Sequence, residues 1–371
     1  MTGNKKDMQK KDTFIIFSEI SWDFLPQRHH FLADYFSKKY KKVYFVERVV
    51  SRVPNILELI RMISNKKREN LKNARIANVV YLRSFFLPND NILFRLWNKI
   101  YWLFFWRQKQ MNAIVYTFTD NPYVIGNSPN TKKLCKKVIL DVIHNWWNFP
   151  WNQNIHKNNI ERLIKLCDFV VTDSSATLSL IKKDKKLLIP PGVSESWFQG
   201  NKSLTTNVKP KIIFFGNLRL NSDLELIRAI ASCSELSLSV YGRIDQTVSD
   251  DLLESCYKGS IENSALPSII AEHDGIIIGY SESDFSSSIS PAKFYESLAT
   301  GKAIFSRNSL NHLPEWSKYV YEISIDDKLS KQIKLSLNKH ELKKLDQINS
   351  AKKHLWKKRF ATIEKIIDEQ L

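Results

Sequence analysis

Short runs of apolar residues, each long enough for one buried strand, alternate with helical patterns along this chain. The first unit has a strand at 13–18, a helix from His30 to Lys39 and a second strand from Val43 to Glu47. In that helix the apolar residues recur at three- and four-residue spacing. A strand, a helix and a strand within about 35 residues form a βαβ unit, whose two strands run parallel with a right-handed crossover. This feature predicts an α/β fold with parallel sheets.

Further buried strands are expected in both halves of the chain. They are at residues 79–84, 113–118, 137–143, 168–174, 211–216, 236–243, 275–280 and 303–306. A chain of 371 residues has room for two such domains, each with its own core. Its hydrophobic content of 43% and charged content of 25% are those of an ordinary globular protein.

Positive charge is concentrated in the first half. Residues 1–210 hold 35 lysine and arginine residues against 16 acidic ones, a net charge of +19, whereas residues 211–371 hold 21 against 22. The whole chain has a formal charge of +18. Halves with such different charge indicate different partners, and the basic half is expected to face something anionic. Nucleic acid, an anionic lipid surface and a phosphorylated acceptor all meet this requirement.

The stretch from Asp274 to Arg307 carries the strongest functional signal. It predicts a buried strand, a serine-rich loop, a helix that opens at Pro291, and a second strand. Lys293 and Glu296 lie three residues apart and so share one face of this helix. The amino end of a helix attracts phosphate, a lysine adds a full charge, and a glutamate can accept hydrogen bonds from sugar hydroxyls. A nucleotide diphosphate would fit here, although a surface helix with an ion pair would show the same residues.

The run SPAKFYESLATGKAIFS, residues 290–306, resembles the donor-binding segment of GT-B glycosyltransferases. That fold has two Rossmann-like domains whose parallel sheets face a central cleft. The resemblance implies that Lys293 meets the diphosphate and Glu296 the ribose. Many retaining members carry a second glutamate eight positions earlier, where this chain has Ser288, and this departure favours an inverting mechanism. Bacterial glucuronosyltransferases of exopolysaccharide synthesis show a similar lysine-bearing helix without that glutamate.

The rest of the second half is similar to the nucleotide-binding domain of the same fold. Gly216 ends a strand and lets a backbone come close to a ligand. The chain has no GxGxxG fingerprint, which argues against a nicotinamide enzyme. The loop near Ile261 resembles the one that reads the nucleotide base, and Arg219 could instead form a surface salt bridge. The residues expected to bind the donor besides Lys293 and Glu296 are Gly216, Asn217, Arg219, Arg243, Ile261, Ser288 and Ser290.

The resemblance also sets the expected domain limits. Residues 1–12 form a disordered lead-in, 13–200 an N-terminal domain that faces the acceptor and the membrane, and 201–210 a polar linker that ends in proline. Residues 211–350 form the domain that binds the nucleotide sugar, and 351–371 form a helix that crosses back to the first domain. The lead-in lacks the apolar segment of a signal peptide.

The loop after the first strand carries Trp22, Asp23, Arg28 and His30. In an open α/β sheet this loop lies at the carboxyl edge, where ligands bind. The segment resembles the first loop of a bacterial GT-B group in which a tryptophan, an arginine and a histidine precede the first helix. Trp22, Arg28 and His30 are therefore expected near the acceptor. Alternatively, Trp22 and His30 only pack.

An inverting transfer needs a base to take the proton of the acceptor hydroxyl. The candidates are Asp23, Asp141 and His144, because each lies in or beside a loop at the expected cleft. Asp141 ends a buried strand and could instead hold the fold together, so Asp23 and His144 are favoured. Trp146 and Trp147 follow His144, and ring faces of this kind stack on sugars.

Residues 92–109, ILFRLWNKIYWLFFWRQK, are apolar and aromatic with basic residues among them. The run is too short, and too often interrupted by charge, to span a bilayer. Its composition suits a helix at a membrane interface, with Trp97, Trp102 and Trp106 as contacts. A helix packed in the core of the domain would explain much of the same pattern.

Together these features predict a glycosyltransferase that moves a sugar from a nucleotide sugar, with UDP-sugars favoured, to a lipid-linked or growing surface glycan such as a capsule, lipopolysaccharide or exopolysaccharide. The chain has no DxD motif and its four cysteines lack metal-ligand spacing, so neither a metal nor another cofactor is expected. The expected location is the cytoplasm, at the anionic inner face of the membrane. The competing hypotheses are a sugar-nucleotide epimerase of the same fold and a nucleic-acid-binding protein, although scattered basic residues argue against nucleic acid as a partner.

Overall fold

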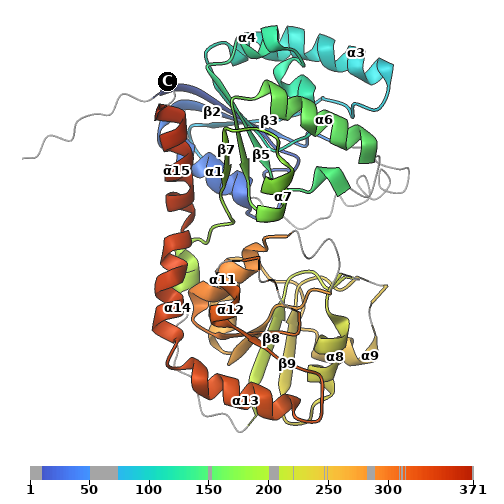
Figure 1. Cartoon of the computed structure of the whole chain (residues 1–371), viewed down its shortest axis with the longest axis vertical. Helices are drawn as coiled ribbons and strands as arrows, with labels where there is room; N and C mark the ends of the chain where they lie inside the picture. The colour runs from blue at the N-terminus through green and yellow to red at the C-terminus, as the bar shows by residue number, and fades with distance from the viewer. Residues whose placement is uncertain are drawn as a thin grey trace, which may run out of the picture. The chain divides into compact units, whose positions relative to one another are not determined.

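The computed structural model describes residues 11–50, 74–148, 153–199, 209–219, 221–245, 247–248, 250–281, 289–308, 310, 312–313 and 315–369. Nearly all of the expected lead-in, most of the expected linker and Ser288 lie outside the described residues. Residue contacts divide the chain into two compact units (Figure 1). Unit 1 comprises residues 1–189 and 360–371, and unit 2 comprises residues 190–359.

Unit 1 is built on a seven-stranded parallel sheet in the order β3-β2-β1-β4-β5-β6-β7. Its strands are β1 (Lys11–Phe17), β2 (Tyr40–Glu47), β3 (Val79–Arg83), β4 (Ile114–Thr117), β5 (Lys137–Val142), β6 (Phe169–Thr172) and β7 (Lys186–Leu188). Strands covered on both faces need continuous apolar sequence, and β4, β5 and β6 are buried throughout. The six strands expected in this half are confirmed, and the short half-buried edge strand β7 is additional.

Helices cover both faces of this sheet (Figure 1). They are α1 (Arg28–Ser37), α3 (Ile92–Tyr101), the π-helical turn η2 (Trp102–Trp106), α4 (Arg107–Gln110), η3 (Pro122–Ile125), α5 (Pro129–Lys132), η4 (Trp146–Asn148), α6 (Gln153–Leu166), α7 (Ser175–Leu180) and the end of α15 (Trp356–Glu369). On one face Phe36 of α1 stacks on Phe14 of β1, with 4.3 Å between ring centroids. On the other face Trp106 of η2 lies edge-on to Phe17, with 5.0 Å between centroids. Because side chains alternate along a strand, one apolar run serves both cores.

Unit 2 has a five-stranded parallel sheet in the order β12-β11-β10-β8-β9. Its strands are β8 (Lys211–Phe215), β9 (Ser237–Tyr241), β10 (Gly275–Ile277), β11 (Ala303–Ser306) and β12 (Val320–Glu322). Its helices are η5 (Glu195–Gln199), α8 (Leu224–Ser232), α9 (Asp251–Cys256), α10 (Leu266–Ala271), α11 (Ala292–Thr300), α12 (Trp316–Tyr319), α13 (Leu329–His340), α14 (Lys344–Ala351), η7 (Lys352–His354) and the start of α15. The four strands expected in this half are confirmed, and β12 is an additional three-residue edge strand.

The segment before β8 packs into the core of unit 2. Trp197 of η5 lies 5.8 Å from Phe215, measured between ring centroids. Gly192 lies so close to Trp356 that an added Cβ would be 2.5 Å from the indole ring. A second core layer, on the opposite face of the sheet, includes Leu226 and other apolar residues of α8 and α13. Unit 2 is therefore a sheet enclosed by two apolar layers, like unit 1.

The strand order of each sheet reverses at one place. In unit 1 the chain runs outward from β1 through β2 and β3 and then returns to β4, on the other side of β1. In unit 2 it runs from β8 to β9 and returns to β10, on the other side of β8. At such a switch point the loops that leave the carboxyl ends of the two strands diverge and leave room for a ligand. The carboxyl edges at β1/β4 and β8/β10 are therefore the places to look for function.

Candidate functional site

α11 is the helix expected to open near Pro291, and Pro291 occupies its N-cap position. One side of the helix, including Phe294, packs in the core. The helix ends at Gly301, whose φ of 63° lies in the left-handed region that favours glycine. Lys293 and Glu296 lie on the remaining, half-buried side, as the spacing predicts.

The ammonium group of Lys293 lies among aromatic rings beside the β8/β10 switch point. Its Nζ is 4.4 Å from the ring centroid of Phe214, 5.3 Å from that of Phe215 and 6.0 Å from that of Tyr280. Burial lowers the pKa of Lys293 to about 8, against the opposing charge of Glu296. Burial raises the pKa of the Glu296 carboxyl to about 7, against the charge of Lys293. Both shifts favour the neutral forms, because the surroundings remove water from each charged group.

Among the described residues, neither the ammonium of Lys293 nor the carboxylate of Glu296 has a hydrogen-bond or ion-pair partner. The ion pair that a surface helix would form between them is therefore not present in this part of the structure. A desolvated cation and carboxylate without partners destabilise the unliganded fold. A phosphate would satisfy the first group and a sugar hydroxyl the second.

Two glycines lie at neighbouring strand ends on this edge of the sheet. Gly216 follows β8 with a φ of 107°, and Gly242 follows β9 with a φ of 131°. An added Cβ on Gly242 would lie 2.1 Å from the carbonyl oxygen of Gly216, and one on Gly216 would lie 3.0 Å from Nζ of Lys293. The end of β8 thus presents bare backbone beside the ammonium group, which lets a phosphate approach, and Gly242 lets the end of β9 pack closely against it.

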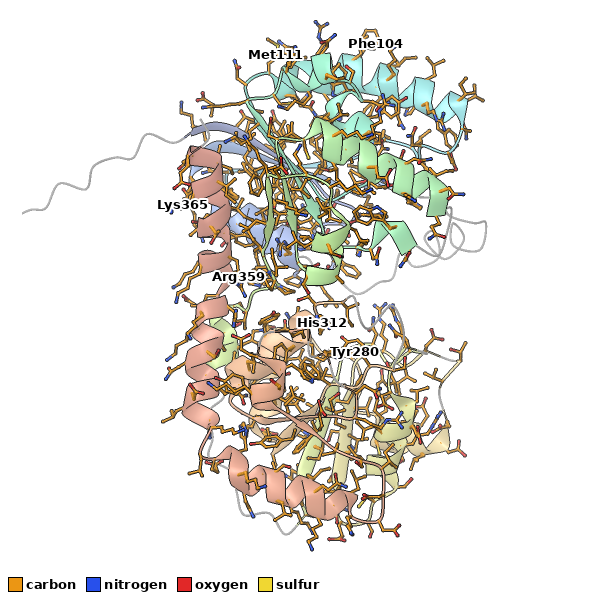
Figure 2. The ribbon with its side chains drawn as sticks, viewed as in Figure 1. Phe104, Met111, Tyr280, His312, Arg359 and Lys365 are labelled. Carbon is orange, nitrogen blue, oxygen red and sulfur yellow. The ribbon has the colours of Figure 1, made fainter. Side chains whose placement is uncertain are left out.

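The other residues expected at the donor site lie in the loops at the same edge. Asn217, Arg219 and Arg243 are exposed, and Ile261 is half-buried. The hydroxyl oxygen of Ser290, just before α11, is buried and has no hydrogen-bond partner within the described residues. His312, which the sequence did not single out, has its Nε2 2.7 Å from the carbonyl oxygen of Ile289. His312 and Tyr280 lie at the same end of unit 2 (Figure 2).

In unit 1 the carboxyl edge holds a buried ion pair. Nε of Arg28 donates to Oδ2 of Asp141 at 2.7 Å, and its NH1 donates to the carbonyl oxygen of Ile189 at 2.6 Å. The hydroxyl of Tyr116 donates to the same Asp141 oxygen at 2.5 Å. Burial lowers the pKa of Arg28, but Asp141, Tyr116 and Asp173 together outweigh burial and the pKa is raised overall. These contacts tie α1, β4, β5 and the end of β7 together. These contacts favour the alternative that Asp141 stabilises the fold and is not a base. They also engage the guanidinium group of Arg28 within the protein.

His144 follows β5 and is half-exposed, with its Nε2 3.4 Å from Oε1 of Glu19. Burial lowers its pKa, but the carboxylates of Glu19, Asp173 and Asp120 raise it above the usual value. At the end of β6, burial raises the pKa of Asp173 to about 7, against the charge of Arg28. Of the three candidate bases, His144 alone has an acidic partner that would stabilise its protonated form. Glu19 and Asp173 were missed in the sequence, although their position just after strand ends was a usable signal.

Asp23, the other favoured base, is exposed and lies 3.5 Å from a guanidinium nitrogen of Arg75. Beside it, Trp22 is buried, with its ring 5.0 Å from that of His30 and 4.7 Å from that of Tyr81. Nε2 of His30 lies 2.9 Å from the carbonyl oxygen of Trp22. The expectation that Trp22 and His30 contact an acceptor is therefore corrected. They pack against each other and fix the loop to α1.

Two further histidines at this edge were not expected. Nδ1 of His156 lies 2.7 Å from Oδ2 of Asp120, and both side chains are buried. His29 lies 3.8 Å from Phe118, measured between ring centroids. Burial holds the pKa of His29 well below its ordinary value, so this ring is neutral. Both histidine side chains are buried, so they pack within unit 1 and do not face solvent.

The expected aromatic contacts divide into buried and exposed residues. Trp102 and Trp106 are buried in the core of unit 1, which corrects the expectation that they contact a membrane. Trp146 is also fully buried and is not available to stack on a sugar, whereas Trp147 is half-buried. Trp97 is exposed. No group of three or more metal-ligating side chains occurs in the part of the chain that the structure describes.

The sequence matches no family profile and no curated protein sequence at a significant level. The structure, in contrast, is similar to solved glycosyltransferases over nearly its whole length. Sucrose-phosphate synthase from Thermosynechococcus elongatus matches with a TM-score of 0.63 at 11% identity, over 97% of this chain and 99% of that one. Anabaena Alr3699/HepE, solved in complex with UDP-glucose, gives 0.60 at 11% identity, over 96% and 98%. A glycosyltransferase from Rickettsia africae gives 0.59 at 14% identity, over 97% and 98%.

These similarities establish the fold. The chain has the GT-B fold of glycosyltransferases, with two Rossmann-like units that each contain a parallel sheet, as the sequence resemblance implies. At such low sequence identity these similarities establish only the fold. The function has to be argued from the residues at the two carboxyl edges.

Proposed function

We propose that this protein is a glycosyltransferase that takes a sugar from a UDP-sugar without a metal and passes it to a lipid-linked or growing surface glycan at the cytoplasmic face of the membrane. The observation that carries the proposal is the pair Lys293 and Glu296 beside the bare backbone of Gly216, neither of which has a hydrogen-bond or ion-pair partner in the described part of the chain. The GT-B fold supports the reaction class. The structurally similar HepE was solved with UDP-glucose, which supports the choice of nucleotide.

In unit 2 the diphosphate would lie between the end of β8 and the start of α11. Lys293 would neutralise the charge that develops on the leaving diphosphate, and the ring-lined surroundings would strengthen that interaction. The free hydroxyl of Ser290 would donate a hydrogen bond to a phosphate oxygen. Glu296, one helical turn further, would accept hydrogen bonds from the hydroxyls of the ribose.

In unit 1 His144 is our choice for the base of an inverting transfer. Glu19 lies next to Nε2 of the ring, so Nδ1 is the nitrogen left to accept the proton of the acceptor hydroxyl. The imidazolium that forms would be stabilised by the Glu19 carboxylate, which orients the ring as a third group does in other acid–base sites.

The test is calorimetric binding of UDP, GDP and ADP without metal to the wild type and to Lys293→Ala. We expect UDP to bind, and the variant to lose tenfold or more in affinity, since a charge-assisted hydrogen bond contributes about 1.5–3 kcal/mol. Lys331→Ala, which removes an exposed lysine of α13 in the same unit, is the matched control and should bind UDP like the wild type. Equal affinity of Lys293→Ala and wild type would show that the donor site is wrongly assigned.

A further inference from the structure

The outer side of α3 and η2 in unit 1 carries several large exposed apolar side chains. Ile92, Leu93 and Phe104 are 79%, 73% and 82% exposed. The residues that we call the apolar stripe are Ile92, Leu93, Leu96, Trp97, Ile100 and Phe104. They recur at three- and four-residue steps and therefore lie along one side of the helix. Phe104 lies on the outer side of this helical layer (Figure 2). A contiguous apolar surface of this kind marks an interaction site.

The opposite side of the same segment is also apolar, and it is fully used by the core. Tyr101, Trp102 and Trp106 are buried there. The π-helical turn makes this possible, because the N–H of Arg107 bonds to the carbonyl oxygen of Trp102, five residues back. The extra residue in the turn directs both tryptophans inward and leaves Leu103 and Phe104 outside. The core of unit 1 is therefore filled by the buried side of the segment, and most of the surface of the apolar stripe remains exposed.

A pocket of about 480 Å³ opens beside the stripe. Its walls come from the carboxyl ends of β2 and β3 and from α3, and they include Val50, Phe85, Leu87 and Trp97. The indole N–H of Trp97 donates to the carbonyl oxygen of Phe85 at 2.8 Å, which fixes the ring against the strand end. The pocket therefore continues the apolar stripe into unit 1.

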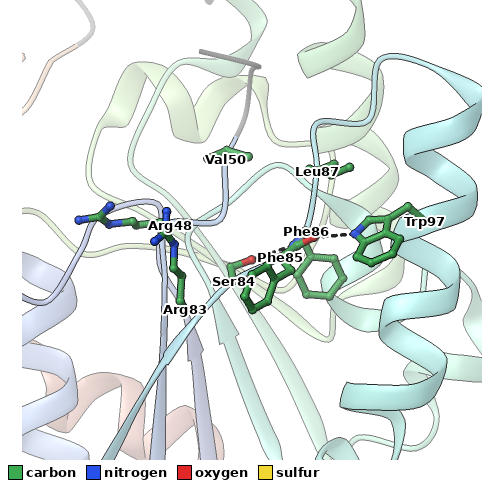
Figure 3. Close-up of a pocket in the computed structure, with 8 residues that line it drawn as sticks. All are labelled: Arg48, Val50, Arg83, Ser84, Phe85, Phe86, Leu87 and Trp97. Atoms are coloured by element: carbon green, nitrogen blue, oxygen red, sulfur yellow. Dashed lines mark hydrogen bonds between the residues drawn. The ribbon is translucent and has the colours of Figure 1, made fainter. Parts of the chain in front are cut away.

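Two arginines, Arg48 and Arg83, line one end of this pocket, opposite Trp97 and Phe85 (Figure 3). They are close together because Glu47 pairs with Arg83 in the parallel register of β2 and β3. The carboxylate of Glu47 accepts a hydrogen bond from the backbone N–H of Trp22 at 2.8 Å instead of pairing with them. Within the described residues neither guanidinium has a hydrogen-bond or ion-pair partner.

We propose that this pocket binds the phosphate of a membrane lipid, with Arg48 and Arg83 on the phosphate oxygens and the apolar stripe inserted among the acyl chains. Paired guanidinium groups recognise phosphate well, and aromatic and aliphatic side chains with basic neighbours suit the bilayer interface. The inference rests on the proposed function and deepens it, because it names the region of unit 1 that receives a lipid-linked acceptor. Among the described residues, no helix is long and apolar enough to cross a bilayer, so the contact is with its surface.

Charge distinguishes a lipid phosphate from two other occupants. Between Asn91 and Ala113 the sequence has four basic residues and no acidic one, so a second copy of this chain would bring like charges together. The sequence from 51 to 73 carries six basic residues against two acidic ones, so its net charge does not complement a pocket lined by Arg48 and Arg83 either. An anionic lipid surface complements both the arginines of the pocket and the four basic residues that lie among and beyond the stripe in the sequence.

The test measures flotation of the full-length protein with vesicles of phosphatidylcholine alone and of phosphatidylcholine containing phosphatidic acid. We expect binding to the second kind, reduced tenfold or more by Arg48→Gln with Arg83→Gln, because each basic residue at an anionic surface contributes about fivefold. The matched control is Lys182→Gln with Lys185→Gln, two exposed cations beside β7 at the other edge of the sheet. It removes the same charge and should bind nearly as well as the wild type.

A second pair of variants tests the apolar stripe. Leu93→Ser with Phe104→Ser should abolish binding to the vesicles that contain phosphatidic acid, whereas Leu342→Ser with Leu345→Ser, two exposed leucines of unit 2, should not. Circular dichroism checks that each variant is folded. The proposal is overturned if the arginine variant binds like the wild type, if the lysine control loses as much, or if the stripe variants keep binding. It is also overturned if millimolar inorganic phosphate releases the protein from vesicles, or if the wild type is a dimer that Leu93→Ser with Phe104→Ser dissociates.

UDP affinity measured on the same preparations separates this inference from the proposed function. Loss of vesicle binding with unchanged UDP affinity is the result expected of the arginine and stripe variants. Vesicle binding without any UDP affinity would reject the donor site and leave the lipid site standing. UDP affinity without any vesicle binding would do the reverse.

Discussion

Both units bring a cation and a carboxylate to the carboxyl edge of a parallel sheet, but they use these charges differently. In unit 1 Arg28 and Asp141 are in direct contact at 2.7 Å, and Tyr116 completes the set. In unit 2 Lys293 and Glu296 sit one helical turn apart, and neither has a hydrogen-bond or ion-pair partner among the described residues. The pKa of Arg28 is raised by its partner, whereas that of Lys293 is lowered to about 8 by burial.

The difference separates charges that stabilise the fold from charges that we propose bind a ligand. A buried pair in contact compensates its own desolvation, so removing one member leaves an uncompensated charge. An unpartnered buried charge destabilises the free protein, and such groups are found mainly at functional sites, where a ligand compensates the desolvation. The unit 1 edge is therefore built around structural contacts, with His144 and Glu19 in its loops, and the unit 2 edge carries the two groups that we propose bind the donor.

The largest expected effect is on stability, at Arg28. Arg28→Met should lower the free energy of unfolding of unit 1 by about 3–5 kcal/mol, because Asp141 is left buried and unpaired. The same change in unit 2, Lys293→Met, removes an unpartnered charge and should change stability by less than about 1 kcal/mol. Hydrogen exchange measured on peptides of β5 and β8 reads the two units separately. Equal destabilisation by both substitutions would remove the distinction between the two edges.

The glycine contact of unit 2 gives the next largest effect. Gly242→Ala should destabilise unit 2 by about 2–4 kcal/mol, since it combines a strained φ with a clash against the Gly216 carbonyl. Gly259→Ala is the control, because its φ is 94° but no atom lies within 4 Å of the added Cβ. It should show only the backbone strain, about 1 kcal/mol. Exchange rates in β8 and β9 peptides measure both, and indistinguishable variants would mean that the backbone contact is not tight.

The pH dependence of UDP binding tests whether the unpartnered lysine is the anion site. A diphosphate favours the charged form of Lys293, so affinity should fall above about pH 8, by up to about tenfold per pH unit. Lys293→Arg keeps its charge at such pH and should show no fall up to about pH 10. Calorimetric titration over this range measures both proteins. An equal fall in the UDP affinity of Lys293→Arg would show that a group other than Lys293 causes the pH dependence.

The smallest expected effect is the pH dependence of stability that Glu296 causes. Its pKa in the folded protein, about 7, lies above the usual 4.5, so the folded state binds the proton more tightly. The contribution of this group is therefore greatest below pH 4.5 and declines as the pH rises to about 7. Allowing for partial exposure, the decline should be about 1–2 kcal/mol and absent from Glu296→Gln. Urea titrations at several pH values decide this, and parallel curves for both proteins would contradict it.

Much of the fold was predictable because its signals are local. All ten strands expected from apolar runs are present. They could be recognised because strands buried on both faces are nearly continuously apolar. The aromatic segment was predicted as a helix, but its pattern could not distinguish the outer side from the inner one. Trp97 is exposed while Trp102 and Trp106 are buried, because the π-helical turn sets their direction. The edge strands β7 and β12 were missed because they are short and only partly buried, whereas the equally short β10 is fully buried and continues into an apolar run.

The sequence by itself determined the α/β class and placed Lys293 and Glu296 on one side of one helix, because strand runs and helical spacing are properties of neighbouring residues. Only the tertiary structure decided which charges meet. Arg28 and Asp141 are 113 residues apart in sequence, and Glu19 reaches His144 from a different strand end. The burial that lowers the pKa of Lys293 also comes from strands far along the chain. Desolvation depends on what surrounds a group in space, and no local pattern encodes it.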